Sequence, residues 1–463
     1  MIAIFLVLVI IFMIYYKKNF EVVKLYKQIS KEMLDFIKRS PSVFHAVDSL
    51  KNELIFNGFE ELAESKKWSL VKGKKYFVTR NSSSIVAFKI GENLDEYSFN
   101  IVASHSDSPS FKIKDNYKIE SSNRYIQLNT EKYGGMIYST WFDRPLSIAG
   151  RIILKNDNFI ETKIVNVDKD LVIIPNVAIH MNKEANSAMK YNEQVDLLPL
   201  YGSLKDGKDN FIDVVAEYAG VNKESIISTD LFLYNRTEPS IWGSEDEFIS
   251  SSRLDNLQCA YGTLKGFIKG SNTNSISVYC CFDNEEVGSG TKQGAASTFL
   301  EDVLKRINNN LSKTNEDYLC ALASSFMISA DNAHAVHPNH PEKSDPTNCV
   351  YMNEGVVIKH NANQKYTTDA VSSAVFQTLC DTASVPYQHY TNRSDMPGGS
   401  TLGNIASLNV SINSVDIGLA QLAMHSSYET AGIKDTYYMI NVIEEFFNTH
   451  FKERNINTLS ISK

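Results

Sequence analysis

SISVYCCFDNEEVGSG, residues 275–290, joins a predicted strand to a run of acids, and the predicted fold depends on how the two are related. The β-branched, aromatic and apolar residues at 275–280 are typical of a buried strand. Asp283, Glu285 and Glu286 follow within four residues and repel one another unless a positive charge lies among them. A run of charge usually belongs to an exposed loop. Alternatively, the acids lie at the carboxyl edge of an α/β sheet, where one glutamate could hold a metal and its neighbour take a proton from water.

Length and composition restrict the class of protein. The chain has 463 residues, enough for two domains, and its 43% hydrophobic and 22% charged residues are ordinary for a soluble globular enzyme. The net charge of −8 provides no basic stripe for phosphates, so no nucleic-acid partner is expected. The six cysteines form no CxxC pair, which favours reduced, mostly buried thiols and a cytoplasmic protein. Cys280 and Cys281, adjacent in the predicted strand, are expected to point to opposite faces.

The first 32 residues differ from the rest of the chain. An apolar run that ends at Tyr16 is followed by two lysines, and it lacks the basic region and cleavage site of a secretory signal. The run is shorter than the roughly 20 apolar residues of a spanning helix. Residues 1–32 are therefore interpreted either as a weak membrane anchor, with contact through residues 1–18, or as an extension ahead of a start at Met33. In both cases the body of the protein stays inside the cell.

Strand and helix patterns divide the remaining chain into three parts. Residues 33–112 combine an amphipathic helix pattern with strand patterns, the last of which is YSFNIVASH at 97–105. Residues 113–234 show short strand patterns, DLVIIP at 170–175 among them, and predict a β-rich insertion or second domain. Strands and helices alternate again over residues 235–463. The predicted fold class is therefore α/β, with a β-rich insertion.

Four further segments share the pattern of the opening one, an apolar stretch that delivers a side chain able to bind a metal. NIVASHSDSP, SSRLDNL, FMISADNAHAVHPNH and IGLAQLAMHSSYE supply His105 with Asp107, Asp255, Asp331 and His425. Each alone is weak evidence, because such residues more often cap helices or complete hydrogen bonds. Together with the acids of the opening stretch they offer two imidazoles, three ligating carboxylates and one spare glutamate. That set suits two zinc-like ions about 3.5–4 Å apart, with one carboxylate bridging them.

In this order, the segments resemble the aspartyl aminopeptidase and aminopeptidase I family of cocatalytic-zinc exopeptidases. The likeness rests on His-x-Asp, RLDNL, DNEEVGS, SADxAHA and AMHS, and it extends to SPSVFHAV, YGGMIYSTWFDRPLSIAGR and PNVAIHMN. It covers nearly everything from Ser40 to the C-terminus. The resemblance implies a mixed-sheet zinc-exopeptidase catalytic domain with an inserted β-rich dimerisation domain. It also implies a metalloaminopeptidase that removes single N-terminal residues from peptides by attack of a hydroxide held by two metal ions.

The resemblance further implies roles for individual residues. One metal ion would be held by His105, Asp255 and Asp331, and the other by Asp255, Glu286 and His425. Glu285 would be the general base, and Asp107 would orient His105 from behind and fix its tautomer.

Substrate contacts are implied in the same way. By its position in the motif, His334 would touch the substrate, whereas His337 and His340 are expected on the surface. Lys359 matches a lysine that holds an acidic first residue in aspartyl-specific members of the family, and Lys365 follows nearby. We therefore expect a preference for N-terminal Asp or Glu, although most lysines are simply solvated.

The implied cofactors are two divalent ions, Zn²⁺ or else Co²⁺ or Mn²⁺, because such ligand sets accept each of them. The implied assembly is a homodimer built by the β-rich insertion and assembled into a dodecamer. His180 resembles a histidine that reaches into the partner's active site; without the resemblance it would be an ordinary sheet histidine. Two alternatives remain at this point: an N-acyl amino acid deacylase with the same kind of centre, and a catalytically silent shell protein, which the complete ligand set disfavours.

Overall fold

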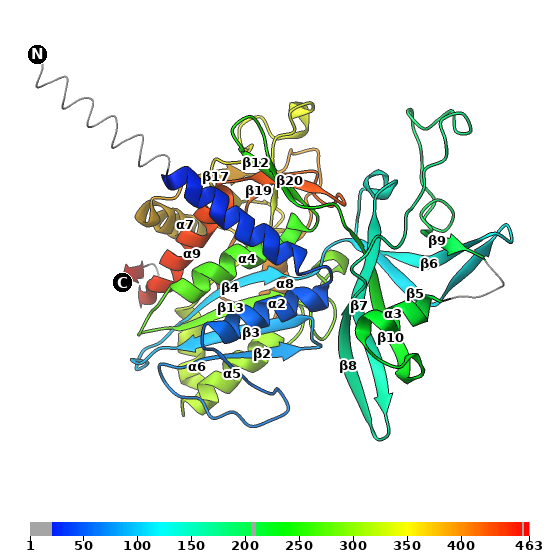
Figure 1. Cartoon of the computed structure of the whole chain (residues 1–463). Helices are drawn as coiled ribbons and strands as arrows, with labels where there is room; N and C mark the ends of the chain where they lie inside the picture. Colours follow the sequence, from blue (N-terminus) through cyan, green and yellow to red (C-terminus); the bar gives the residue numbers. More distant parts are fainter. Residues whose placement is uncertain (1–20, 205–209, 456–457, 463) are drawn as a thin grey trace, which may run out of the picture.

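The computed structural model describes residues 21–204, 210–455 and 458–462, which form two domains (Figure 1). One is an α/β domain with a nine-stranded sheet, and the other, on the right in Figure 1, contains a six-stranded sheet. The chain enters the second domain shortly after β4 (Phe99–His105) and leaves it at the end of β10 (Ile226–Asn235). The predicted fold class, a mixed-sheet α/β domain with an inserted β-rich domain, is confirmed.

Four parallel strands form the centre of the large sheet, whose order is β1-β2-β3-β13-β4-β14-β18-β16-β17. These are β13 (Ile276–Phe282), β4, β14 (Phe326–Ala330) and β18 (Asn413–Gly418). On either side, β3 (Ser84–Ile90) and β16 (Val356–Lys359) run antiparallel to their central neighbours. The edges are β2 (Lys75–Arg80), β1 (Glu60–Glu61) and β17 (Tyr387–Tyr390). Because parallel neighbours end at the same edge, the segments that follow the central strands meet there.

Helices cover both faces of this sheet, as the continuous burial of β4, β13 and β14 requires. One face carries α2 (Val43–Phe56), α4 (Leu254–Lys269), α7 (Ala370–Ala383) and α9 (Asp435–Asn448). The other carries α5 (Phe299–Asn310), α6 (Asn315–Ala323) and α8 (Leu402–Ala406). Cys281 packs in the first of these cores and Cys280 in the second, so the prediction that they face opposite ways is confirmed.

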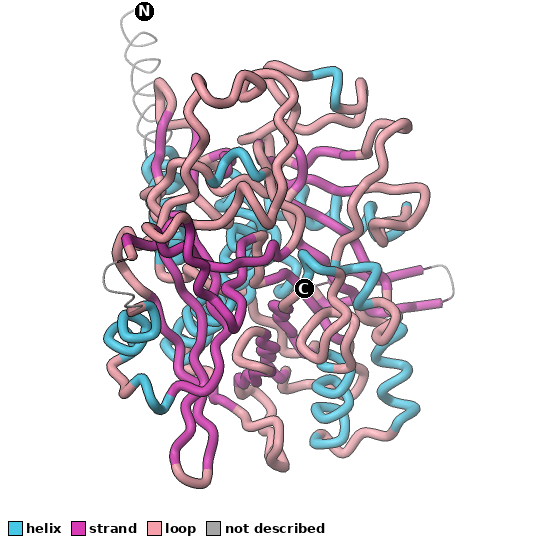
Figure 2. Tube along the Cα trace, turned by 90° about the vertical axis from the view of Figure 1, so that its right-hand side faces the viewer, coloured by secondary structure: helices cyan, strands magenta, loops and turns pink. Residues whose placement is uncertain are grey.

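The sheet of the inserted domain is antiparallel and has one buried face. Its order is β8 (Phe159–Asn166), β7 (Leu146–Asn156), β10, β5 (Ser110–Ser121), β6 (Tyr125–Tyr133) and β9 (Leu200–Ser203). Helix α3 (Phe211–Ala219) packs on the core of this domain. Figure 2, which looks from the side of the inserted domain, shows its long strands in front of the α/β domain. The stretch 170–175 forms isolated bridges in place of a strand, because residues 172 and 174 pair with the segment 142–146 while residue 173 pairs with Leu200.

Two smaller sheets complete the structure. A five-stranded sheet has the order β11 (Ser240–Trp242), β12 (Phe248–Ser251), β20 (Glu429–Gly432), β19 (Ala420–Leu422) and β15 (Ala333–His334). Its strands β15 and β19 continue the chain beyond β14 and β18, so this sheet borders the carboxyl edge of the large one. A hairpin of β21 (His450–Asn455) and β22 (Thr458–Ser462) follows α9.

An N-terminal helix over residues 21–38 packs against the α/β domain. Lys27 Nζ lies 2.6 Å from Asp246 Oδ2, and the buried Ser30 Oγ donates a hydrogen bond to the carbonyl of Ile433 at 2.9 Å. The boundary predicted between residues 32 and 33 therefore falls inside a helix that belongs to the folded body.

The segment considered for membrane contact, residues 1–18, lies outside the described part of the chain. Within the described part, no helix is both long and apolar enough to cross a bilayer.

Candidate metal centre

The predicted ligands come from distant parts of the chain and meet at the carboxyl edge of the large sheet. His105 is the last residue of β4, and Asp331 directly follows β14. Glu286 lies in a short 3-10 turn, Glu285–Val287, shortly after β13. Asp255 lies at the start of α4, and His425 lies between β19 and β20, both next to the five-stranded sheet.

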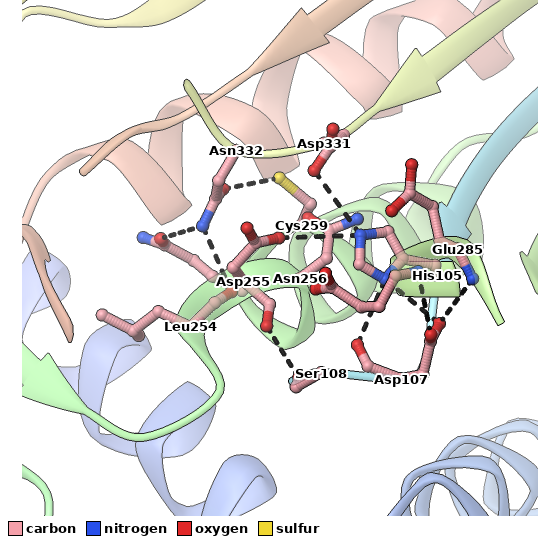
Figure 3. A network of polar contacts seen from close by, with 12 residues as sticks. His105, Asp107, Ser108, Leu254, Asp255, Asn256, Cys259, Glu285, Asp331 and Asn332 are labelled. Carbon is pink, nitrogen blue, oxygen red and sulfur yellow. Dashed lines mark hydrogen bonds and ion pairs between the residues drawn. The ribbon is translucent and has the colours of Figure 1, made fainter. Parts of the chain in front are cut away.

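These side chains form two groups that share Asp255. In the first, His105 Nε2 lies 3.6 Å from Asp255 Oδ1 and 3.5 Å from Asp331 Oδ1 (Figure 3). In the second, His425 Nε2 lies 3.5 Å from Asp255 Oδ2 and 3.4 Å from Glu286 Oε2. The candidate ligand atoms of each group lie within 4.8 Å of one another. Because its two oxygens face two different histidines, the Asp255 carboxylate is oriented to bridge two cations.

The burial and charge of this cluster fit divalent metal ions. Asp255 Oδ1 and Glu286 Oε1 are buried and accept no hydrogen bond within the described part of the chain. A buried polar atom left in this way costs about 1–3 kcal/mol. Burial, and then the charge of Asp255, raises the pKa of Glu286 well above its ordinary value. A bound cation would relieve both penalties, and imidazole with carboxylate is a donor set that zinc, cobalt and manganese accept.

Hydrogen bonds from the second ring nitrogens fix the tautomers of both histidines. Nδ1 of His105 lies 3.1 Å from the carbonyl oxygen of Asp107, and Nδ1 of His425 lies 2.5 Å from that of Gly135. A carbonyl oxygen can only accept, so each Nδ1 carries the proton and each Nε2 presents its lone pair to the cluster. Gly135 follows β6, so the inserted domain helps to position His425 within the same chain.

Asp107 links His105 to the acidic turn. Its carboxylate accepts hydrogen bonds from the amides of Glu285 and Glu286, both at 3.1 Å, and from the Tyr133 hydroxyl at 2.7 Å. Its Oδ1 also lies 3.4 Å from Nδ1 of His105 (Figure 3). One carboxylate thus orients a candidate ligand and holds the backbone of the turn that carries the two glutamates.

Glu285 lies beside the two groups that share Asp255 and belongs to neither of them. Its carboxylate can also be grouped with His105 and Glu286. Burial raises the pKa of Glu285 to about 8. A carboxyl group with such a proton affinity is suited to accept and return a proton near neutral pH.

Glu429, to which the sequence assigned no role, holds the backbone of two members of the cluster in place. Only 2% of this residue is exposed. Its Oε2 accepts the amide N–H of Asp255 at 3.0 Å, and its Oε1 accepts that of His425 at 2.7 Å. Burial, and then the charge of Asp255, raises the pKa of Glu429 to about 8. The sequence signal that could have pointed to Glu429 is an acid at the start of the mostly apolar stretch ETAGI, four residues after the predicted ligand His425.

The structure brings Lys359 to the cluster as well. Lys359 ends β16, is 2% exposed, and places its Nζ 3.3 Å from Asp331 Oδ2. Burial disfavours the charged ammonium, but Asp331 and other nearby acidic groups outweigh it, so the pKa of Lys359 lies above its ordinary value. His334, in β15, lies within the electrostatic reach of the same cluster, and desolvation followed by Lys359 lowers its pKa.

Other predicted residues lie away from the cluster in this chain. Lys365 is exposed, and no ion pair of its ammonium group occurs within the described part of the chain. His180 is exposed in the connection between β8 and β9. His337 and His340 are exposed in the segment after β15.

An α/β domain with imidazoles and carboxylates gathered at its carboxyl edge around a shared aspartate defines the class of metal-dependent hydrolases. The family model described as aminopeptidase I zinc metalloprotease (M18) matches residues 36–447. The chain therefore belongs to the M18 family, and it is a metalloaminopeptidase.

Individual relatives span almost the whole chain. A probable M18 family aminopeptidase 2 of Clostridium novyi is 50% identical over 425 residues, covering 90% of this chain and 98% of the relative. A chain of the cryo-EM structure of the Ape4 and Nbr1 complex is 34% identical, with a TM-score of 0.89 and coverage of 92% and 86%. A chain of the S. cerevisiae mApe1 dodecamer is 26% identical, with a TM-score of 0.80 and coverage of 91% and 97%.

Proposed function

We propose that this metalloaminopeptidase removes single N-terminal residues from peptides with the help of two divalent metal ions, zinc or else cobalt or manganese. The observation that carries the proposal is the orientation of Asp255, each of whose oxygens faces a different histidine across 3.5–3.6 Å. His105 and Asp331 would complete one metal site, and Glu286 and His425 the other. When bound, such ions lower the pKa of an attacking water and polarise the peptide carbonyl.

The residues of the chain supply the proton transfers. Glu285 takes a proton from the attacking water and returns it to the leaving amine. Its backbone amide is held by Asp107, so the carboxylate is presented toward the cluster from a fixed turn. His334, close to the same cluster, is proposed to contact the substrate.

Two measurements test this part of the proposal. A peptide with a free amino terminus is expected to be cleaved and its N-acetylated form to resist, whereas the reverse order would indicate a deacylase. Chelator-treated protein is expected to lose activity and to recover fully only after two equivalents of zinc, cobalt or manganese. Full recovery with one equivalent would contradict a dinuclear centre.

Lys359 is proposed to select acidic N-terminal residues. A lysine beside two divalent cations is repelled unless anions separate them, and Asp331 provides one such anion at 3.3 Å. An ammonium group has three donors, so others remain for a substrate carboxylate. A charge-assisted hydrogen bond of this kind contributes about 1.5–3 kcal/mol, or about 10- to 150-fold in selectivity.

The test compares kcat/KM for Asp-, Glu- and Leu-peptides. Wild type is expected to prefer Asp and Glu, Lys359→Met is expected to lose the preference by about 10-fold or more, and Lys365→Met, the same change at an exposed lysine, to keep it. A wild-type preference for Leu, or an acidic preference that survives in Lys359→Met, would show that Lys359 does not set specificity. Loss of the preference in Lys365→Met as well would favour a role for Lys365.

We further propose a homodimer, assembled into a dodecamer, in which His180 reaches the active site of a partner. The support is that His180 lies among exposed apolar side chains of the inserted domain, Val177, Ile179 and Met181, the last of them 82% exposed. Such a surface is typical of protein–protein contacts. The mApe1 neighbour is a dodecamer. The six free cysteines support a cytoplasmic location.

A further inference from the structure

A short segment of the inserted domain, residues 133–135, lies directly against the metal centre of the α/β domain. The carbonyl oxygen of Gly135 accepts a hydrogen bond from Nδ1 of His425. Gly134 has a φ of +77°, and a Cβ added to it would lie 3.1 Å from Cβ of Glu286. Both the conformation and the close approach favour glycine at this position. Two of the three residues thus contact candidate ligands of the second metal group.

The remaining residue of the segment, Tyr133, reaches the support of the first group. Its hydroxyl donates a hydrogen bond to Asp107 Oδ2 at 2.7 Å and accepts one from Asn284 Nδ2 at 2.9 Å. A carboxylate only accepts and a tyrosine hydroxyl has one hydrogen, so the direction of both bonds is fixed. The Tyr133 ring packs edge-on against Phe232 of β10, with 5.7 Å between the ring centroids. The sheet of the inserted domain therefore holds this hydroxyl in place.

Both partners of the Tyr133 hydroxyl support the turn that carries Glu285 and Glu286. Asp107 accepts the backbone amides of the two glutamates, both at 3.1 Å. Asn284 directly precedes the turn and has a left-handed backbone with a φ of 62°. The start of the turn is thus held by two side chains that meet at one hydroxyl of the other domain.

The side chain of Asn284 is oriented by partners at both of its ends. Its Oδ1 accepts hydrogen bonds from Thr291 Oγ1 and Gln293 Nε2, both at 2.8 Å. Its Nδ2 donates to the Tyr133 hydroxyl. Phenylalanine in place of Tyr133 would keep the ring but remove one donor from Asp107 and the acceptor of Asn284 Nδ2.

We propose that Tyr133 is a positioning residue for the general base, through which the inserted domain sets the position of the acidic turn. The inference rests on the proposed role of Glu285 as that base. Tyr133 acts through Asp107 and Asn284, which hold the backbone of the turn. The placement of the inserted domain on the α/β domain is thereby coupled to the rate of proton transfer.

The test compares Tyr133→Phe with Tyr125→Phe, the same change at an exposed tyrosine at the other end of β6. Both full-length variants are assayed at saturating zinc, with equal metal content verified. Tyr133→Phe is expected to lower kcat by about 10- to 100-fold and to change KM by less than about threefold, because the interaction serves the chemical step. Tyr125→Phe is expected to match wild type. A kcat within about twofold of wild type, a loss that appears mainly in KM, or an equal loss in Tyr125→Phe would overturn the proposal.

Hydrogen exchange on the zinc-loaded proteins reports the turn directly. The amides of Glu285 and Glu286 are expected to exchange about tenfold faster in Tyr133→Phe than in wild type, and at the wild-type rate in Tyr125→Phe. Unchanged exchange in Tyr133→Phe would overturn the proposal, because the turn would then be held without the hydroxyl.

Asn284→Gly breaks the same hydrogen bond from its other end while glycine keeps the left-handed backbone. It is expected to lower kcat at unchanged KM, and the double variant with Tyr133→Phe to lose less than the product of the two single losses. Multiplicative losses would show that the two residues act independently and would overturn the proposal.

Glu285→Gln, assayed beside these variants, separates the positioning role from the proposed base. An inactive Glu285→Gln together with a fully active Tyr133→Phe would overturn the positioning role alone. A Glu285→Gln enzyme that keeps more than a few per cent of kcat would overturn the base and, with it, the role of Tyr133.

Discussion

Replacing Glu429 by glutamine is expected to weaken metal binding without removing any ligand. The two carboxylate oxygens of Glu429 accept the backbone amides of Asp255 at 3.0 Å and of His425 at 2.7 Å. Glutamine keeps the shape but turns one acceptor into an N–H₂ group, so one of these buried amides faces a donor. A buried amide left without its acceptor costs about 1–3 kcal/mol. The expected result is metal affinity reduced by about 10- to 100-fold, the usual range for residues that orient ligands.

The assay is competition with a chromophoric chelator, combined with turnover at limiting and at saturating zinc. Excess zinc is expected to restore most of the turnover of Glu429→Gln, because the ligands and Glu285 remain. Glu60→Gln, the same change at an exposed position of β1, should behave as wild type. A circular dichroism spectrum confirms that the fold is retained. Metal affinity within about twofold of wild type would refute the role of Glu429 in positioning Asp255 and His425.

Three further outcomes are expected. Glu285→Gln should lower kcat by about 10²- to 10⁴-fold at near-normal metal content, whereas Glu286→Gln should lower occupancy of one metal site; a Glu285→Gln enzyme that keeps more than a few per cent of kcat contradicts the proposed base. Mixing inactive Glu285→Gln chains with inactive His180→Ala chains should restore some activity, and failure after verified subunit exchange would show that His180 does not act across subunits. Deleting residues 1–32, which the sequence sets apart from the rest of the chain, should lower the free energy of unfolding by about 2 kcal/mol or more, because it removes the buried hydrogen bond of Ser30 and the aromatic contacts of Tyr26; unchanged stability would show that these contacts contribute nothing.

The sequence by itself determined the elements of the α/β domain and the family to which the chain belongs. β4 and β13 lie within two residues of where their patterns place them, because strands of a sheet covered on both faces are buried along their whole length and therefore largely apolar. The same pattern made the candidate ligands recognisable in the sequence, since each follows an apolar stretch that ends abruptly. Elements whose pairing is dispersed were less predictable: the stretch 170–175 has a strand pattern but forms isolated bridges.

Only the tertiary structure decided how these residues act together. Asp255 and His425 are 170 positions apart in sequence, and their shared support by Glu429 depends on the pairing of β12 with β20. The helix over 21–38 is recognisable as part of the folded body only through its contacts with residues such as Asp246 and Ile433. Local sequence patterns report which residues are buried or exposed along one element, whereas the partners of a buried charge are set by packing between elements distant in sequence.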